Sequence, residues 1–263
     1  MEISIVIPAY NEAERIGKTL EAYAQFFKSK VKSKVLKRFE VLVVLNGCSD
    51  NTLEIVKKIH KKHKEVIFLD FKQGGKGFAI LEGFKDAFTR KYSHIGFVDA
   101  DLATSPEAFY ELLMNMEGYD GIMGSRWLKE SKVMTRQPLL RLIMSRGFNT
   151  IVRTLLVFPY KDTQCGAKIF TLKSLQKVVP KIHHTQWAFD IELLYHLRKQ
   201  EFQVREFPTT WEDRKGSKLN VTNVPMQMFL AVVRIRIIHS PFKKIVTWYD
   251  TLPKKLKIHK IRI

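Results

Sequence analysis

The segment HIGFVDAD, residues 94–101, gives the pattern from which the fold of this chain is predicted: a short, mostly apolar run that ends in two aspartates. Other short runs, rich in β-branched residues, recur along the first half of the chain. They occupy residues 3–7, 39–45, 66–71, 94–98 and 121–124. Continuous apolar runs of this kind are typical of strands that are buried on both faces of a sheet.

Amphipathic stretches separate these runs and predict helices at about residues 12–22, 52–62, 77–91 and 106–116. Asn11, with Glu14 three residues later, predicts the cap of the first helix. Ser105 followed by Pro106 predicts the start of the fourth. Strands that alternate with helices form a mostly parallel, twisted sheet with helices on both faces and right-handed crossovers. The predicted fold class is therefore α/β.

The second half of the chain is less regular. We expect helices at 139–157 and 187–200, and strands at 167–171 and 203–207. Two further helices, each started by a proline, are expected at 225–238 and 241–251. No repeat or low-complexity linker divides the chain. The sequence therefore predicts one α/β domain over residues 1–222, followed by basic amphipathic helices over residues 223–263.

The chain is strongly basic: 45 Lys and Arg against 26 Asp and Glu give its 263 residues a formal net charge of +19. Such a charge favours anionic partners, among them nucleic acid, nucleotides, phospholipid surfaces and phosphorylated metabolites. Thermostable proteins can also be rich in lysine without an anionic partner, so charge alone does not choose among these. The two cysteines, Cys48 and Cys165, are too few for a disulfide scaffold or a four-cysteine zinc site.

Membrane-crossing and secretory signals are not expected from this sequence. The N-terminal MEISIVIPAY has no basic region and no small-residue cleavage site, so we expect it to form the first strand, in a reducing cytoplasm. A spanning helix needs roughly 20 apolar residues, whereas the longest clean run near the C-terminus covers 228–233. If a membrane is involved, the protein is expected to lie on its surface.

The predicted strands of the first half deliver polar or glycine-rich residues to one edge of the sheet, where open α/β sheets bind ligands. The loops concerned are residues 8–12, 46–50, 74–77, 99–101 and 125–126. Asp99 and Asp101 lie two residues apart, so their carboxylates leave the strand on one side. Two hard oxygen ligands suit Mg²⁺ or Mn²⁺, which can bridge the phosphates of a nucleotide. The alternative is that Asp99 only ends a strand and Asp101 only caps a loop.

The loop Gly74-Gly75-Lys76-Gly77 precedes a predicted helix. It could present backbone amides to a phosphate, or it could be an ordinary turn. The P-loop pattern is absent, and no G-x-G-x-x-G follows the first strand. These two absences argue against ATPases of the P-loop class and against nicotinamide-dependent enzymes.

Charged residues elsewhere are weaker candidates. Arg141 and Ser145 are four residues apart on one helix face, and Arg126 follows the fifth strand. Arginine suits bidentate binding of phosphate, although a single arginine is more often a solvated surface residue. Three acids lie in apolar or aromatic surroundings, where helix capping is the commoner role: Asp162, Asp190 and Glu192.

The order of the motifs points to a known family. The first half resembles the family-2 glycosyltransferases of the GT-A fold in PAYNE (8–12), NGCSDNT (46–52), GGKG (74–77), DAD (99–101) and GSR (124–126). The second half is similar to the polyprenyl-phosphate sugar synthases, nearer the dolichyl-phosphate glucosyl branch than the mannosyl one. The motifs there are DTQCGAK (162–168), WAFDIELL (187–194) and GSKL (216–219).

The resemblance implies a metal-dependent, inverting transfer of a hexose, expected to be glucose, from a nucleotide-diphosphate sugar to a polyprenyl or dolichyl phosphate. It implies that Asp99 and Asp101 hold Mg²⁺ or Mn²⁺ and form the catalytic set with Asp190. The residues implied for donor binding are Pro8, Tyr10, Glu12, Asn46, Lys76, Asp99, Asp101, Arg126, Arg214 and Lys218. Those implied for the acceptor phosphate are Arg126, Arg141, Ser145 and Ser217. Because a phosphate monoester is already anionic at neutral pH, Asp190 would act as a base only if the acceptor were a hydroxyl.

The chain departs from the family pattern at two places. The family usually carries two acids after the second strand, where this chain has Leu45 and Asn46. This puts contact between a carboxylate and the nucleobase in question. Mannosyl members carry a glutamine two places after the second aspartate, where this chain has Ala103. The second departure implies a metal shell that contains more water.

The C-terminal region predicts contact with lipid. It carries nine Lys or Arg and one acid between residues 234 and 263. Apolar residues at helical spacing form two stripes: Met226, Phe229, Leu230, Val233 and Ile237, then Phe242, Ile245, Val246 and Tyr249, with Trp248 alongside. Apolar stripes ringed by basic residues are typical of helices that lie on anionic lipid. We expect a peripheral protein on the cytoplasmic face of a membrane; the alternative is that both stripes pack on the domain or on a second subunit.

Two other functions remain open from the sequence. One is GDP-mannose-dependent mannosyl transfer to the same kind of acceptor. The other is a non-catalytic basic module that binds membranes or nucleic acid. No nucleic-acid-binding motif or set of stacking aromatics accompanies the charge, so we expect no nucleic-acid partner. The sequence predicts no oligomeric state.

Overall fold

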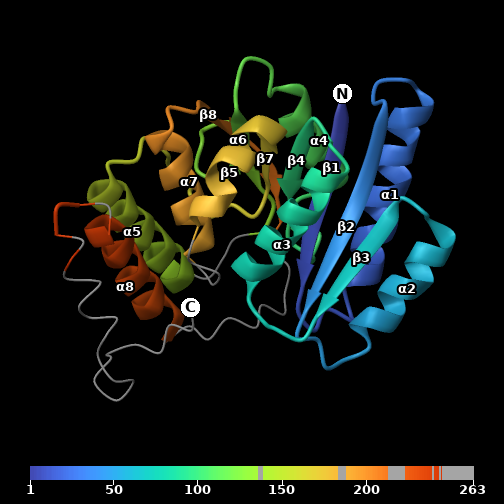
Figure 1. The fold of residues 1–263 in the computed structure, drawn as a ribbon, viewed down its shortest axis with the longest axis horizontal. Helices are drawn as coiled ribbons and strands as arrows, with labels where there is room; N and C mark the ends of the chain where they lie inside the picture. The colour runs from blue at the N-terminus through green and yellow to red at the C-terminus, as the bar shows by residue number, and fades with distance from the viewer. Residues whose placement is uncertain (136–138, 183–187, 213–222, 239, 243, 245–263) are drawn as a thin grey trace.

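A computed structural model describes residues 1–135, 139–182, 188–212, 223–238, 240–242 and 244. Its centre is a seven-stranded sheet in the order β3-β2-β1-β4-β7-β5-β8, with helices on both faces (Figure 1). Six of the seven strands run parallel, whereas β7 is antiparallel to both of its neighbours, β4 and β5. The predicted α/β class with a mostly parallel sheet is confirmed.

Each strand of this sheet coincides with one of the predicted strands. The strands are β1 (Glu2–Ala9), β2 (Arg38–Asn46), β3 (Val66–Phe71), β4 (His94–Phe97), β5 (Gly121–Ser125), β7 (Lys168–Thr171) and β8 (Val204–Pro208). The central strands are buried almost along their whole length, since helices cover both faces of the sheet.

The helices divide the core into two layers. On one face lie α1 (Ile16–Lys32), α2 (Thr52–Lys62) and α4 (Pro106–Met114), with the fully buried rings of Tyr23, Phe27 and Phe109 between them and the sheet. On the other face lie α3 (Lys76–Thr89), α6 (Leu172–Val178), a 3₁₀ turn (Val179–Lys181) and α7 (Phe189–Lys199). There Phe97 lies 6.0 Å from Phe189, ring centre to ring centre, which packs β4 directly beneath the start of α7.

Two helix starts test the predicted caps. The Ser105 hydroxyl accepts a hydrogen bond from the Ala108 N–H at 3.3 Å, and Pro106 opens α4, so this cap is confirmed. The cap predicted at Asn11 is wrong, because α1 begins only at Ile16. Asn11 has a φ of 52°, and its side-chain oxygen instead accepts the N–H of Ser49 at 2.8 Å, which ties the loop after β1 to the loop after β2.

Some elements were not predicted. α6 directly follows β7, and its start is capped by the Thr171 hydroxyl, which accepts the Ser174 N–H. A second, two-stranded sheet pairs β6 (Lys132–Val133) with β9 (Thr210–Trp211). Thr104, three residues after Asp101, forms an isolated bridge with Trp211. This small sheet therefore attaches the loop after β4 to the C-terminal part of the domain.

The predicted C-terminal helix is present as α8 (Asn223–Ile238), which packs beside α5 (Leu139–Leu156) (Figure 1). Its buried residues recur at helical spacing: Met228, Ala231, Val232 and Ile235. Phe229, from the apolar stripe predicted to meet lipid, is on the exposed side, and Leu230 and Val233 are half-buried. The second predicted stripe lies outside the described residues except for Phe242, which is exposed.

Candidate active site

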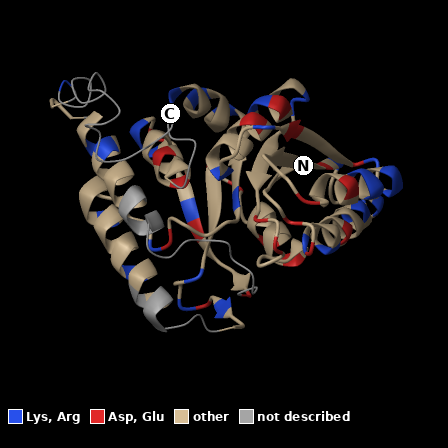
Figure 2. Cartoon of the chain, turned by 90° about the horizontal axis from the view of Figure 1, so that it is seen from below, with Lys and Arg blue, Asp and Glu red and all other residues tan. Residues whose placement is uncertain are grey.

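The carboxyl ends of β1, β2, β4 and β5 lie at one edge of the sheet, which Figure 2 shows from below. Because β7 runs antiparallel, it begins at this same edge, and its first residue, Lys168, pairs with Phe97, the last residue of β4. The loop that carries Asp99 and Asp101 therefore lies beside the segment that leads into β7. The predicted gathering of polar loops at one edge is confirmed.

Asp99 and Asp101 are held differently. The Asp101 carboxylate accepts the N–H of Ala103 at 3.0 Å, in a tight turn through Leu102, whose φ is 61°. Burial, together with the negative charge of Asp99, raises the pKa of Asp101 above its ordinary value. The Asp99 side chain is 36% exposed and forms an ion pair with Lys76, whose Nζ lies 2.5 Å from its Oδ1. The two carboxylates thus repel each other, and the positive charges of Arg15 and Lys76 offset part of the cost at Asp101.

Lys76 reaches this position because it opens α3 directly after Gly75, whose φ of 138° suits only glycine. Burial opposes the charge of its ammonium group, but the carboxylates of Asp99 and Asp190 raise the pKa of Lys76 well above its usual range. Lys76 therefore stays charged, and it brings a cation and the start of a helix to the two aspartates.

Asn46 fixes the glycine loop in place. Its side-chain N–H donates to the Ala9 carbonyl at 2.9 Å, and its side-chain oxygen accepts the Gly75 N–H at 3.1 Å. The residue is only 2% exposed. An amide suits this position, because a carboxylate could not donate to Ala9. These two contacts are a physical reason for an asparagine at this position.

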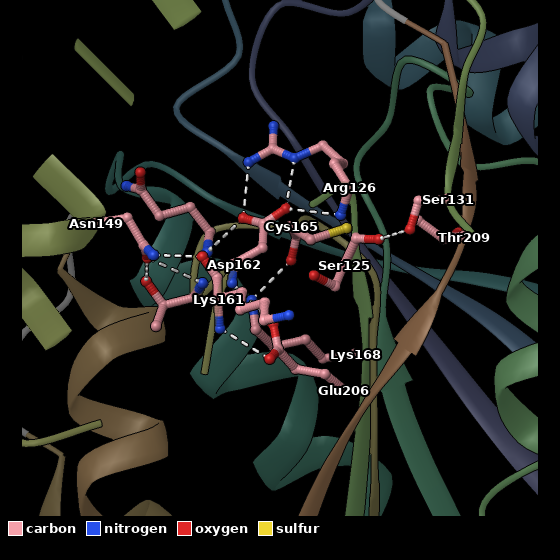
Figure 3. A network of polar contacts seen from close by, with 12 residues as sticks. Ser125, Arg126, Ser131, Asn149, Lys161, Asp162, Cys165, Lys168, Glu206 and Thr209 are labelled. Atoms are coloured by element: carbon pink, nitrogen blue, oxygen red, sulfur yellow. Dashed lines mark hydrogen bonds and ion pairs between the residues drawn. The ribbon is translucent and has the colours of Figure 1, made fainter. Parts of the chain in front are cut away.

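Arg126 forms an ion pair with Asp162, as Figure 3 shows. Its Nε and Nη2 donate to the two oxygens of the Asp162 carboxylate at 2.7 and 2.8 Å, and its backbone N–H donates at 3.0 Å. Burial alone would raise the pKa of Asp162, but Arg126 lowers it below its ordinary value. The guanidinium also lies 5.3 Å from the Trp211 ring centre, so Arg126 is held on two sides.

The loop before β7 is itself anchored by two neighbouring side chains (Figure 3). The Glu206 carboxylate, on β8, accepts the backbone N–H groups of Lys161 and Asp162, both at 2.8 Å. Asn149, on α5, accepts the Thr163 hydroxyl at 2.8 Å and donates to the Lys161 carbonyl. These contacts make the segment 161–163 a rigid support for Arg126.

Lys168 is fully buried, which is rare for a lysine. Its Nζ donates to the Asp190 carboxylate at 2.9 Å and to the Cys165 carbonyl at 2.7 Å, and it lies 5.2 Å from the Phe97 ring centre. Asp190 stands in the first turn of α7. The pair therefore joins β7 to α7 and holds Asp190 on the side of the site that faces Lys76.

The structure places the other predicted donor and acceptor residues as follows. Pro8 is buried in β1, and Tyr10 is 51% exposed just beyond it. Glu12 binds Arg15 through two hydrogen bonds of 2.8 Å. Arg141 and Ser145 lie on α5 as predicted, and Ser145 is half-buried. Three predicted residues lie outside the described part of the chain: Arg214, Ser217 and Lys218.

Sequence reasoning missed Lys168, Glu206 and Asn149. A signal for Lys168 was present, since a lysine at the start of an apolar strand requires a buried partner. Glu206 gave no such signal, because it follows Arg205 in a strand that carries two adjacent charged residues. Asn149 gave no signal, because an asparagine within a long helix has no local feature that reveals a contact with a distant loop.

Asp99 and Asp101 are the candidate ligands for a metal ion. Among the described residues, no group of three or more His, Cys, Asp or Glu side chains could hold a metal ion together. Asp99 and Asp101 nevertheless fit a hard divalent cation whose other ligands are water and phosphate oxygens. The fit rests on the ion pair of 2.5 Å between Lys76 and Asp99, which shows that a cation can already approach this carboxylate closely.

Comparison with known proteins agrees with this arrangement. Residues 4–179 match the family described as Glycosyl transferase family 2. Over 243 residues the chain is 33% identical to the dolichyl-phosphate beta-glucosyltransferase of Dictyostelium discoideum, covering 89% of this chain and 73% of that protein. It is 30% identical to the human enzyme of the same name, covering 83% and 69% respectively.

Solved structures show the same fold at lower identity. The glucosyl-3-phosphoglycerate synthase of Mycobacterium tuberculosis, in complex with Mn²⁺ and UDP, matches with a TM-score of 0.62 at 16% identity, covering 90% of this chain and 78% of that one. S. aureus TarS matches with a TM-score of 0.58 at 16% identity, covering 95% and 69%. The chain thus has the GT-A fold. In the described part of the chain, no helix is long and apolar enough to cross a bilayer.

Proposed function

The chain belongs to glycosyl transferase family 2, and we propose that it transfers glucose from a nucleoside-diphosphate sugar to dolichyl phosphate or another polyprenyl phosphate, with inversion at the anomeric carbon. The observation that carries the proposal is the meeting of Asp99, Asp101 and Lys76 at the carboxyl edge of the sheet. Relatives at about 30% identity, which are dolichyl-phosphate beta-glucosyltransferases, support glucose and a polyprenyl phosphate as the substrates.

In this proposal, the first half of the domain binds the donor. Asp99 and Asp101 hold Mg²⁺ or Mn²⁺, which when bound neutralises the diphosphate of the donor. Lys76 and the N-terminus of α3 offer that diphosphate further positive charge. The exposed ring of Tyr10 is available to stack on the nucleobase, and Pro8, Glu12 and Asn46 border the nucleoside.

The second half of the domain binds the acceptor. An oxygen of the acceptor phosphate forms the new bond to the anomeric carbon, while the bond to the nucleoside diphosphate breaks. A phosphate monoester has a second pKa near 6, so it is an anionic nucleophile at neutral pH and needs no strong base. The site must instead orient the phosphates and offset their repulsion. We assign that work to the residues predicted to bind phosphates of the donor or of the acceptor, which are Arg126, Arg141, Ser145, Arg214, Ser217 and Lys218.

Asp190 then has an electrostatic role rather than that of a base. Its carboxylate is paired with Lys168 at 2.9 Å and helps to keep Lys76 charged. An acceptor that carries only a hydroxyl group would need a base, and Asp190 is the residue that would supply it.

We further propose that the protein binds the cytoplasmic surface of an anionic membrane, where a polyprenyl phosphate is found. The support is the exposed side of α8, with Phe229 36% exposed, together with Phe242, which is 66% exposed beyond the helix. In the sequence, Arg234 and Arg236 follow Phe229, and Lys243 and Lys244 follow Phe242. Sedimentation with vesicles that contain anionic lipid at low salt tests this point: Phe229→Ser/Phe242→Ser should reduce the bound fraction, and unchanged binding would contradict it.

The enzymatic proposal is tested by UDP release. The protein, UDP-glucose, Mn²⁺ and dolichyl phosphate together should produce UDP, and omission of the lipid or the metal should abolish the product. GDP-mannose in place of UDP-glucose tests mannosyl transfer. Salt-sensitive binding to DNA, retained in an Asp99→Ala/Asp101→Ala variant and accompanied by no turnover with any nucleotide sugar, would instead support a non-catalytic basic module.

A further inference from the structure

Gly166 leaves no room for a side chain, because the Asp99 carboxylate fills the place where one would stand. A Cβ on Gly166 would lie 2.5 Å from the carboxylate carbon of Asp99 and 3.0 Å from its Oδ1, and it would be closer still to its Oδ2. Real Cβ atoms essentially never approach other atoms closer than 3.0 Å. The backbone of Gly166 is not in the left-handed region, so the obstacle to a side chain at residue 166 is this collision with Asp99.

The backbone of Gly166 cannot withdraw from Asp99. Its neighbours Cys165 and Ala167 are both fully buried. The Cys165 carbonyl accepts the Lys168 ammonium at 2.7 Å, and the Ala167 carbonyl accepts the Gly124 N–H at 2.9 Å. The segment is thus fixed on both sides of the glycine, and a new side chain at residue 166 would displace the carboxylate rather than the backbone.

Asp99 therefore lies between a fixed backbone and a cation. Gly166 bounds its carboxylate on one side, and Lys76 Nζ approaches Oδ1 to 2.5 Å. Asp101 is held differently, because its Oδ1 accepts the N–H of Ala103, two residues away, within a local turn. The direction of Asp99 is thus set by a residue 67 positions later in the chain, on the segment that enters β7.

We infer that Gly166 is a positioning residue, which sets the direction of the Asp99 carboxylate toward the metal ion and so tunes the affinity of the site for that ion. The inference rests on the proposed function, because it takes Asp99 to be a metal ligand. Gly166 itself touches neither metal nor substrate. Its effect should appear in metal affinity first and in the turnover of the metal-saturated enzyme to a smaller extent.

The test is Gly166→Ala in the full chain, with Mn²⁺ titrated calorimetrically in the presence of UDP. We expect Gly166→Ala to weaken the affinity for Mn²⁺ at least tenfold, while the circular dichroism spectrum remains that of the folded protein. Gly147→Ala is the matched control, because a Cβ there, on α5, would meet nothing within 4 Å. Mn²⁺ affinity within twofold of the wild type for Gly166→Ala would overturn the inference.

A double-mutant cycle on the melting temperature tests the contact separately. Asp99→Ala removes the three atoms that a Cβ at residue 166 would strike, so Gly166→Ala should lower the melting temperature in the wild type but not in the Asp99→Ala background. Equal losses in both backgrounds would overturn the inference. Failure of the wild type to bind Mn²⁺ with UDP would overturn the proposed function instead, and the cycle would still report on the contact.

Discussion

Lys76 Nζ lies 2.5 Å from Asp99 Oδ1, so that the first residue of α3 and the loop after β4 share one ion pair. Lys168 forms the second such pair, with Asp190. Together with Asp101, these two pairs make five side chains, which carry three carboxylates and two ammonium groups. One negative charge is left over among these five side chains, and the positive charges of Arg15 and Arg126 also act on Asp101 and Asp99 respectively.

The first prediction concerns competition between Lys76 and the metal ion. Lys76→Met should bind Mn²⁺ alone more tightly than the wild type, on the order of tenfold, because the ammonium no longer occupies Asp99. Titration of Mn²⁺ without nucleotide measures the change. Lys85→Met, at an exposed lysine of α3, is the control and should bind Mn²⁺ as the wild type does. Weaker binding of Mn²⁺ by Lys76→Met would show that Lys76 supports the site instead.

The second prediction concerns pH. Because the folded protein raises the pKa of Asp101 above the ordinary value of 3.8, the folded state holds its proton more tightly than the unfolded chain does. The stability that this group contributes is therefore complete below about pH 3.8 and is lost as the pH rises through the raised pKa. In metal-free buffer, Asp101→Asn should gain stability relative to the wild type between pH 4 and pH 7, as urea unfolding would measure. A constant difference across this range would contradict the shift.

The third prediction concerns Asn46. Asn46→Asp should lower the free energy of unfolding by about 2 kcal/mol at pH 7, since a carboxylate cannot donate to the buried Ala9 carbonyl. Asn115→Asp removes a similar side-chain hydrogen bond, of 2.9 Å to the Glu111 carbonyl, at an exposed site. It should cost about 0.5 kcal/mol or less. Equal losses for the two variants would mean that the buried hydrogen bond from Asn46 to Ala9 stabilises the fold no more than an exposed one.

The fourth prediction concerns the buried lysine. Lys168→Met should lower the free energy of unfolding by about 3 kcal/mol, because it leaves the Asp190 carboxylate without its partner. Lys177→Met, at an exposed position of α6, should change stability by about 0.5 kcal/mol at most. Chemical denaturation gives both values. A Lys168→Met variant as stable as Lys177→Met would show that the pair contributes nothing to the fold.

The sequence was sufficient to predict the main sheet, because its strands are apolar runs separated by amphipathic helices. It could not predict the small sheet, since β6 and β9 have two residues each and show no periodicity. The antiparallel direction of β7 could not be predicted from the local sequence pattern either. Strand direction depends on which neighbours a strand joins, and β7 inserts between β4 and β5 from a distant part of the chain.

The candidate site could likewise be predicted only in part from the sequence. The loops that carry Asp99, Asp101 and Lys76 could be predicted to meet, because the carboxyl ends of parallel strands share one edge of a sheet. The contacts of Gly166 and Lys168 could not, since they require β7 to begin beside the end of β4. The predicted cap at Asn11 failed for a related reason: its side chain is engaged by a loop almost 40 residues away, at Ser49.

We propose that Asp99 and Asp101 hold a divalent ion on the diphosphate of the donor. Calorimetry of UDP binding, with and without Mn²⁺, tests this in the wild type and in Asp99→Asn/Asp101→Asn. We expect Mn²⁺ to strengthen UDP binding at least tenfold in the wild type and to have no effect in the variant, whose melting temperature should stay close to that of the wild type. Equal UDP affinity with and without Mn²⁺ in the wild type, or an undiminished effect of Mn²⁺ in the folded variant, would contradict it.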